Sequence, residues 1–172
     1  MQRDIYKQLL RWKNKKTRKP LILNGARQVG KTYILREFGE KEYQKVAFFS
    51  LDRNQKVREV FEKSGNTADI LMALSAISQV NITPGDTLLV LDEIQDCPKA
   101  LEALKFFCEE TPDIHIVVAG SLLGLSLHDG TSYPVGKVEE MRLYPMTFLE
   151  FLNAMGKTQL VDIIINKNGR DQ

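Results

Sequence analysis

The sequence predicts an α/β fold, a three-layer α/β/α sandwich in which helices cover both faces of a mainly parallel, five-stranded sheet. Short apolar runs of strand length alternate with longer segments of helical periodicity, which is the pattern that parallel sheets produce. Strands covered on both faces are nearly continuous in apolar residues, so the composition of the runs supports the same fold. The strands are expected at residues 21–24, 46–49, 87–91, 114–119 and 138–143.

The helices are placed by apolar spacing and by the turn residues between them. Ile5, Leu9 and Trp12 fall on one face of the first helix. Pro98 suits the first turn of a later helix, whose buried stripe is expected to include Leu101, Leu104 and Cys108. Helices are expected at residues 4–13, 31–43, 55–63, 67–80, 98–110, 145–154 and 157–165.

Length and composition fit one ordinary globular domain. With 172 residues, 43% apolar and 27% charged, the chain is neither a disordered tail, a collagen-like chain nor a disulfide mini-protein. Cys97 and Cys108 are too far apart for a redox pair or a zinc knuckle, so we expect reduced thiols and a cytoplasmic location. The longest nearly apolar stretch, 116–127, is shorter than the roughly 18–20 residues of a membrane span, and no signal peptide is recognisable.

Positive charge is concentrated at the N-terminus, although the net charge is only +2. Residues 1–19 hold eight basic residues and one acid, a net of +7, whereas the remainder holds 16 basic and 21 acidic residues, a net of −5. This segment is either a nucleic-acid or phosphate-binding patch or a solvated helix that leads into the domain. We therefore expect a basic lead-in over 1–19, a core over 20–156 and a C-terminal helix with a frayed end over 157–172.

A glycine-rich loop follows the first strand and opens a helix. Residues 25–32, GARQVGKT, match the pattern GxxxxGK[ST]. In this pattern backbone N–H groups and the helix N-terminus bind phosphate oxygens, the lysine contacts the β- and γ-phosphates, and the hydroxyl binds Mg²⁺. We expect nucleotide contacts from Gly25, Ala26, Arg27, Gln28, Val29, Gly30, Lys31, Thr32 and Tyr33.

Two acids end the third predicted strand, at the same edge of the sheet as the loop. Asp92 is expected to hold Mg²⁺ together with Thr32, because one carboxylate near a hydrated ion is enough. Glu93 is expected to orient and deprotonate the water that attacks the γ-phosphate. Kinases that use a substrate hydroxyl do not need this second acid, so the pair favours hydrolysis.

Ser121 follows the fourth predicted strand. It is the third candidate catalytic residue at this edge of the sheet, with Lys31 and Glu93. If that strand lies between the first and the third, Ser121 would sense the γ-phosphate or hold the attacking water; otherwise it is a turn or capping residue. His115 and the pair Phe106 and Phe107 fit structural roles in the core. His128 has no partner in sequence that would make it a metal ligand.

Four segments occur in a fixed order and carry a family resemblance: GARQVGKT, LLVLDEIQ, VVAGSLLG and RLYPMTFLEFL. From about Tyr6 to Leu152 the chain resembles prokaryotic AAA+-type ATPases of the P-loop superfamily, whose ATPase core usually precedes an uncharacterised C-terminal domain. The resemblance implies ATP rather than GTP, Mg²⁺ at Thr32 and Asp92, and catalysis by Glu93. It also implies γ-phosphate sensing by Ser121 and a basic N-terminal helix near the nucleotide base.

The chain departs from this family in two respects. Many relatives have Gly-Arg before the fifth strand, but here the pair is Gly136 and Lys137, which lacks the guanidinium fork. We also expect the 172 residues to contain neither the helical lid nor the C-terminal domain, so an arginine finger would come from residues outside them or from another subunit. We expect a slow ATPase core that drives or switches an appended domain or partner, and the partner can be a further copy of the same chain. The alternative is a non-hydrolysing nucleotide-binding module, associated with nucleic acid through residues 3–19.

Overall fold

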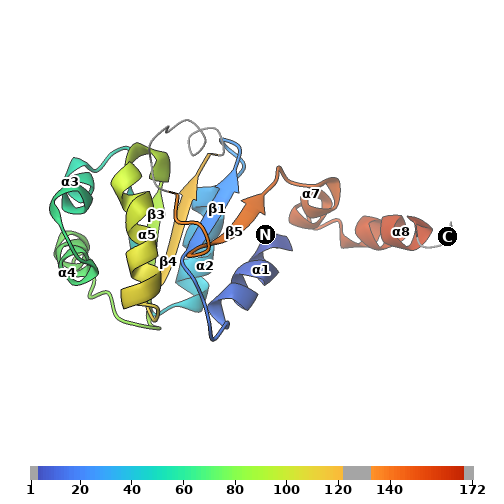
Figure 1. The fold of residues 1–172 in the computed structure, drawn as a ribbon. Coiled ribbons are helices and arrows are strands. Elements are labelled where there is room, and N and C mark those ends of the chain that lie inside the picture. Colours follow the sequence, from blue (N-terminus) through green and yellow to red (C-terminus); the bar gives the residue numbers. More distant parts are fainter. Residues whose placement is uncertain (1–3, 122–132, 169–172) are drawn as a thin grey trace.

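A computed structural model of the chain describes residues 4–121 and 133–168. Figure 1 shows a twisted sheet between two layers of helices, with two further helices extending away from the sheet. Some expectations fall outside the described residues: Arg3, His128, most of the loop after Ser121, and the end of the chain after Asn168. Among the described residues, no helix has both the length and the apolar character needed to cross a membrane.

The sheet confirms the predicted fold class, because its five strands are paired in parallel throughout. The strand order is β2-β3-β4-β1-β5, which places β4 between β1 and β3. The carboxyl ends of these three central strands therefore lie at one edge, as the role expected for Ser121 requires. The strands are β1 (Leu21–Gly25), β2 (Lys45–Ser50), β3 (Thr87–Asp92), β4 (His115–Gly120) and β5 (Glu139–Leu143).

Seven α-helices and one short 3₁₀ helix, η1, connect or flank the described strands. The helices α1 and α2 cover one face of the sheet, and α3, α4 and α5 cover the other (Figure 1). The expected element order is confirmed, whereas η1 was not predicted. The bounds are α1 (Asp4–Lys13), α2 (Lys31–Glu42), α3 (Gln55–Lys63), α4 (Thr67–Ser78), η1 (Ile94–Asp96), α5 (Pro98–Glu110), α7 (Phe148–Ala154) and α8 (Thr158–Asn168).

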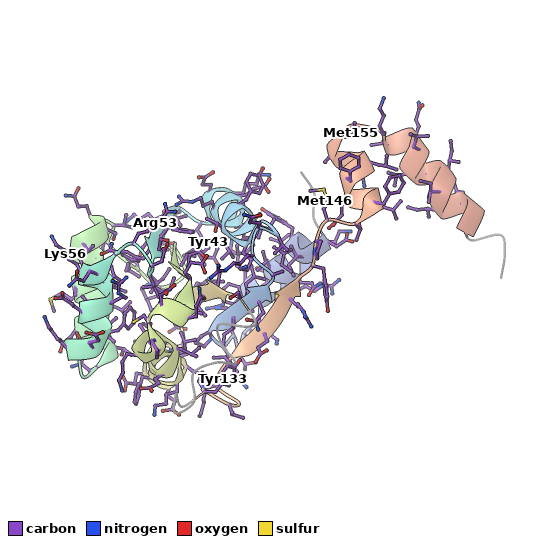
Figure 2. All side chains as sticks on the ribbon, turned by 90° about the horizontal axis from the view of Figure 1, so that it is seen from above. Tyr43, Arg53, Lys56, Tyr133, Met146 and Met155 are labelled. Carbon is purple, nitrogen blue, oxygen red and sulfur yellow. The ribbon has the colours of Figure 1, made fainter. Side chains whose placement is uncertain are left out.

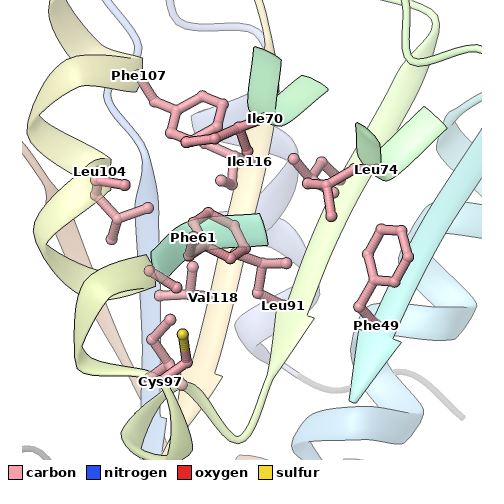
Figure 3. Packing of buried hydrophobic residues seen from close by; sticks show 14 of the residues in the cluster. Phe49, Phe61, Ile70, Leu74, Leu91, Cys97, Leu104, Phe107, Ile116 and Val118 are labelled. Atoms are coloured by element: carbon pink, nitrogen blue, oxygen red, sulfur yellow. The ribbon is translucent and has the colours of Figure 1, made fainter. Parts of the chain in front are cut away.

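The core divides into two apolar clusters because successive strand residues point to opposite faces. In β1, Leu21 and Leu23 pack towards α1 and α2, whereas Ile22 packs towards the other layer. Figure 3 shows that other layer, where Phe61, Leu104 and Phe107 lie over the side chains of β3 and β4. Fully apolar strands are therefore explained by two buried faces, as expected from the sequence.

The apolar stripe of α5 differs in detail from the predicted one. Leu101 and Leu104 are buried as expected, and Phe107 is 1% exposed, but Phe106 is 42% exposed and is not a core residue. Cys108 is half-buried and Cys97 buried, and both are free thiols. Residue 107 lies three positions after 104 and so continues the same helix face, whereas 106 points away from it.

The helices α7 and α8 project from the sheet as a hairpin (Figures 1 and 2). A capping box begins α7: the Thr147 hydroxyl accepts a bond from the Glu150 amide, and the Glu150 carboxylate accepts one from the Thr147 amide. Leu152 of α7 and Val161 of α8 are buried, and the two helices contact each other. The backbone amide of Asp4 donates to Glu150, which connects the hairpin to the start of α1.

Candidate nucleotide-binding site

The loop between β1 and α2 has the shape that the glycine pattern predicts. Gln28 and Gly30 adopt left-handed backbone conformations, with φ of 62° and 95°. Such conformations turn successive N–H groups towards one concave side, which binds anions. At Gly25 a Cβ atom would come within 2.6 Å of the carbonyl oxygen of Leu143, so no side chain fits there.

Lys31 lies on the concave side of this loop. Its Nζ donates to the carbonyl oxygens of Gly25, at 2.9 Å, and Ala26, at 2.8 Å, and the residue is only 7% exposed. Burial lowers the pKa of the ammonium, and the negative charges of Glu93 and Asp92 oppose that shift. The loop therefore holds a cation at the point where phosphate oxygens would approach its amides.

Thr32 and Asp92 meet across the end of the sheet. The Thr32 hydroxyl donates to Asp92 Oδ2 at 2.5 Å, and the amide of Glu93 donates to Asp92 Oδ1 at 3.0 Å. Burial raises the pKa of Asp92, and these hydrogen bonds oppose the rise. Among the described residues no cluster of three or more potential ligands forms a protein-only metal site. A hydroxyl beside a carboxylate nevertheless fits Mg²⁺, which keeps several waters and binds substrate phosphates.

Glu93 occupies a strained position directly after β3. Its backbone is left-handed, with φ 56° and ψ 51°. Such a conformation in a non-glycine residue costs roughly 1–3 kcal/mol and is concentrated at functional sites. The Glu93 carboxylate accepts a hydrogen bond from Gln95 Nε2 at 2.5 Å, so the side chain has a defined direction.

Lys31, Thr32 and Glu93 line one cleft of about 670 Å³ at the carboxyl edge of the sheet, and Asp92 contacts it through Thr32 without being part of the lining. That volume is within the range of small-molecule sites, roughly 300–1,000 Å³. Tyr33 is 57% exposed at its margin. The lining residues are Arg27, Gln28, Gly30, Lys31, Thr32, Tyr33, Asp52, Glu93, Gln95 and Asp96.

The structure brings most of the predicted site residues together and adds three that the sequence analysis did not select. Asp52 follows the end of β2, and its carboxylate accepts a bond from the Ser50 hydroxyl at 2.5 Å, which lowers the pKa of Asp52. Gln95 and Asp96 belong to η1. The sequence held only part of the signal for Asp52: all parallel strands end at one edge, but the place of β2 beside β3 is known from the structure.

Ser121 is buried directly after β4, and Gly120 pairs with Asn24 of β1. Ser121 does not line the cleft, so its role as a sensor of the γ-phosphate stays a prediction. Val29 packs against the core, and Ala26 is exposed; neither lines the cleft.

Other candidate residues lie elsewhere in the fold. His115 is buried at the start of β4, where its Nδ1 is 2.7 Å from the Tyr43 hydroxyl, which confirms a structural role. Lys137 forms an ion pair with Glu109 at 2.9 Å. Because it precedes β5, Lys137 lies near the amino edge of the sheet, at the opposite end from the phosphate-binding loop.

Four of the seven lead-in cations that the structure describes contact the protein itself. Lys13 pairs with Glu42 at 3.5 Å, and Lys15 pairs with Glu139 at 2.6 Å. Arg18 donates to the Lys13 carbonyl at 3.0 Å, and Lys19 Nζ donates to the Gly136 carbonyl at 2.8 Å. These contacts favour the interpretation that this segment leads into the core and is fastened to it.

The parallel sheet, the phosphate-binding loop and the two acids define a P-loop ATPase domain of the AAA+ type. A family model described as an AAA domain matches residues 17–152, most of the chain. The chain therefore belongs to this AAA domain family, and its core is a nucleotide-binding ATPase core. Among curated proteins, no sequence matches the chain.

The solved structures that share the fold include an ATPase and a DNA-bound protein. A Walker-type ATPase of Pyrococcus abyssi has a TM-score of 0.54 at 18% identity, over 89% of this chain and 57% of that one. The ORC1 protein of Aeropyrum pernix, solved in complex with DNA, has a TM-score of 0.54 at 16% identity, over 92% of this chain and 47% of that one. The chain thus spans about half the length of the solved chains that it matches.

Proposed function

We propose that the chain binds ATP with Mg²⁺ in the cleft beside α2 and hydrolyses it, in a cycle that drives or switches an appended domain or partner. The observation that carries this proposal is the meeting of Lys31, Thr32 and Asp92 with Glu93 at one edge of the sheet. A cation, a metal-binding pair and a carboxylate base are the groups that phosphoryl transfer to water requires.

Each residue has a separate task in this proposal. Loop amides and Lys31 would bind the β- and γ-phosphates, while Thr32 and Asp92 would hold Mg²⁺. The ion supplies positive charge that neutralises the phosphate oxygens. Glu93 would accept a proton from the attacking water as the water oxygen bonds to the γ-phosphorus and the bond to the β–γ bridging oxygen breaks. ADP and phosphate then leave.

Nucleotide binding and hydrolysis are tested separately with three variants. Lys31→Ala should lose both ATP binding and hydrolysis, and Glu93→Gln should keep binding and lose hydrolysis. Glu40→Gln, on an exposed position of α2, is the control and should retain both. Hydrolysis is measured with radiolabelled ATP, and binding by thermal unfolding with ATP, ADP or GTP.

The outcomes separate the candidate functions. A ligand at 100 times its Kd should stabilise the fold by about 2.7 kcal/mol. Stabilisation by ATP without hydrolysis by the wild type would replace our proposal with a non-hydrolysing regulatory module. Equal hydrolysis by the wild type and Glu93→Gln would show that Glu93 is not the base. The absence of a shift with any nucleotide in the presence of Mg²⁺ would refute both functions.

Nucleic acid is the second candidate partner, and the DNA complex of the ORC1 protein favours testing it. Within the described part of the chain, Lys7, Arg11 and Lys16 have no ion pair or hydrogen-bonding partner on their side chains. If they bind phosphates, neutralising all three should weaken DNA binding and reduce its salt dependence. DNA affinity that is unchanged by the triple variant would exclude this surface. The cytoplasmic location and any homo-oligomer or appended domain stay predictions.

A further inference from the structure

Gln95 connects the carboxylate of Glu93 with the end of β4. It is the second residue of η1, two positions after Glu93, and it lines the same cleft as Glu93. Its Nε2 donates to Glu93 Oε2 at 2.5 Å. A second hydrogen bond of Nε2, to Asp96 Oδ2, is longer, at 3.4 Å. The shorter bond is therefore directed at the residue that we propose as the base.

The backbone of η1 fixes the position of Gln95. The amide of Asp96 donates to the Glu93 carbonyl at 3.0 Å, and the amide of Cys97 donates to the Ile94 carbonyl at 3.1 Å. Ile94 is fully buried in the core between the sheet and α5. With its neighbour anchored in this way, Gln95 projects from a rigid turn rather than from a loose loop.

Gly120, the last residue of β4, leaves the space that the amide of Gln95 occupies. A Cβ atom at this position would come within 2.9 Å of Gln95 Oε1 and within 2.9 Å of Ile94 Cγ2. Any side chain at residue 120 would therefore displace the turn or the amide. Gln95 is thus enclosed between the end of β4 and the carboxylate of Glu93.

We propose that Gln95 is a positioning residue for hydrolysis, which holds the Glu93 carboxylate at an angle set by the end of β4. This inference rests on the proposed function. A neutral amide donor suits the task, because it binds one carboxylate oxygen without competing as a base for the proton of the water. The other carboxylate oxygen of Glu93, Oε1, would then face the attacking water. The arrangement also couples the orientation of Glu93 to the strand that precedes Ser121.

The first test separates turnover from binding. Gln95→Ala removes the side chain, and Gln95→Met keeps its length without a donor. Both should lower kcat at least about tenfold, as expected for loss of a hydrogen bond to a charged group. The Kd of a fluorescent ATP analogue with Mg²⁺ should change less than twofold. The matched control is Gln55→Ala, because Gln55 donates to Glu59 at 3.0 Å on the exposed surface of α3.

The second test is a double-mutant cycle with Glu93→Gln. If Gln95 acts through Glu93, Gln95→Ala should lower the residual turnover of Glu93→Gln by less than twofold. A loss of the same size in both backgrounds, or wild-type turnover in Gln95→Ala, would overturn the inference. If the wild type itself hydrolyses ATP no faster than Lys31→Ala, the proposed function fails and the inference fails with it.

Discussion

The buried pair of His115 and Tyr43 should make the fold less stable in mild acid. The Tyr43 hydroxyl lies 2.7 Å from His115 Nδ1, and both residues are buried. Burial lowers the pKa of His115 to about 4, and the positive charges of Arg18 and Lys13 contribute to the shift. In the protonated ring both nitrogens are donors, so Nδ1 cannot accept a hydrogen bond from the Tyr43 hydroxyl.

The sign and size of the effect follow from these pKa values. An unfolded histidine binds its proton at about pH 6.5, whereas the folded chain resists protonation of His115 down to about pH 4. Between these values the unfolded state binds more protons, so the free energy of unfolding falls as the pH falls. The stability is complete above pH 6.5, and the loss reaches about 3 kcal/mol below pH 4.

Urea unfolding at pH 7.5 and pH 4.5 measures this loss against a control. In the double variant Tyr43→Phe/His115→Phe both polar partners are replaced by apolar rings, so no buried polar group is left alone. The wild type should lose about 2.5 kcal/mol more than the double variant between the two pH values. Other titrating groups are common to both proteins and cancel. An equal loss in both would refute the assignment of this pH dependence to His115.

Two further substitutions test local features of the fold. Gly25→Ala forces a Cβ against the Leu143 carbonyl and should reduce the free energy of unfolding by about 1–3 kcal/mol in urea titration. Gly65→Ala, where a Cβ meets open space, should change it by less than about 0.5 kcal/mol; similar losses in both would disprove the steric reason. Thr147→Ala removes the capping box and should destabilise α7 by about 0.5–2 kcal/mol. Faster hydrogen exchange of α7 amides, with core amides unchanged, is the expected result, and unchanged α7 exchange would show that the cap contributes nothing.

The sheet was predictable because its physical causes are local. Parallel strands buried on both faces are nearly continuous in apolar residues, and that pattern is visible in 88–91 and 116–119 without any knowledge of pairing. Strand order was predicted only as a condition for Ser121 and needed the structure. The prediction that Phe106 is a core residue was wrong for a local reason too, because the spacing from Leu104 favours Phe107 on the buried face.

The site was predictable where a loop pattern or the end of an apolar strand determines it. The phosphate-binding loop needs glycines and a lysine at fixed spacing, so Gly25 and Lys31 were identified directly. Asp52 and Gln95 carry no such pattern. Their presence in the cleft depends on which strand neighbours β3 and on how η1 turns, and both are properties of the assembled fold.

The two edges of the sheet differ in how their polar groups are stabilised. At the amino edge, His115 has a hydrogen-bonding partner in Tyr43, and Lys15 pairs with Glu139, so these groups are satisfied by the protein itself. At the carboxyl edge, Lys31 and Asp92 both have pKa values shifted against their charged forms by burial, and Glu93 has a strained backbone. Burial of charge costs free energy unless further partners offset it. A phosphate and a cation would supply those partners, so we expect ligand binding to stabilise this edge more than any other part of the fold.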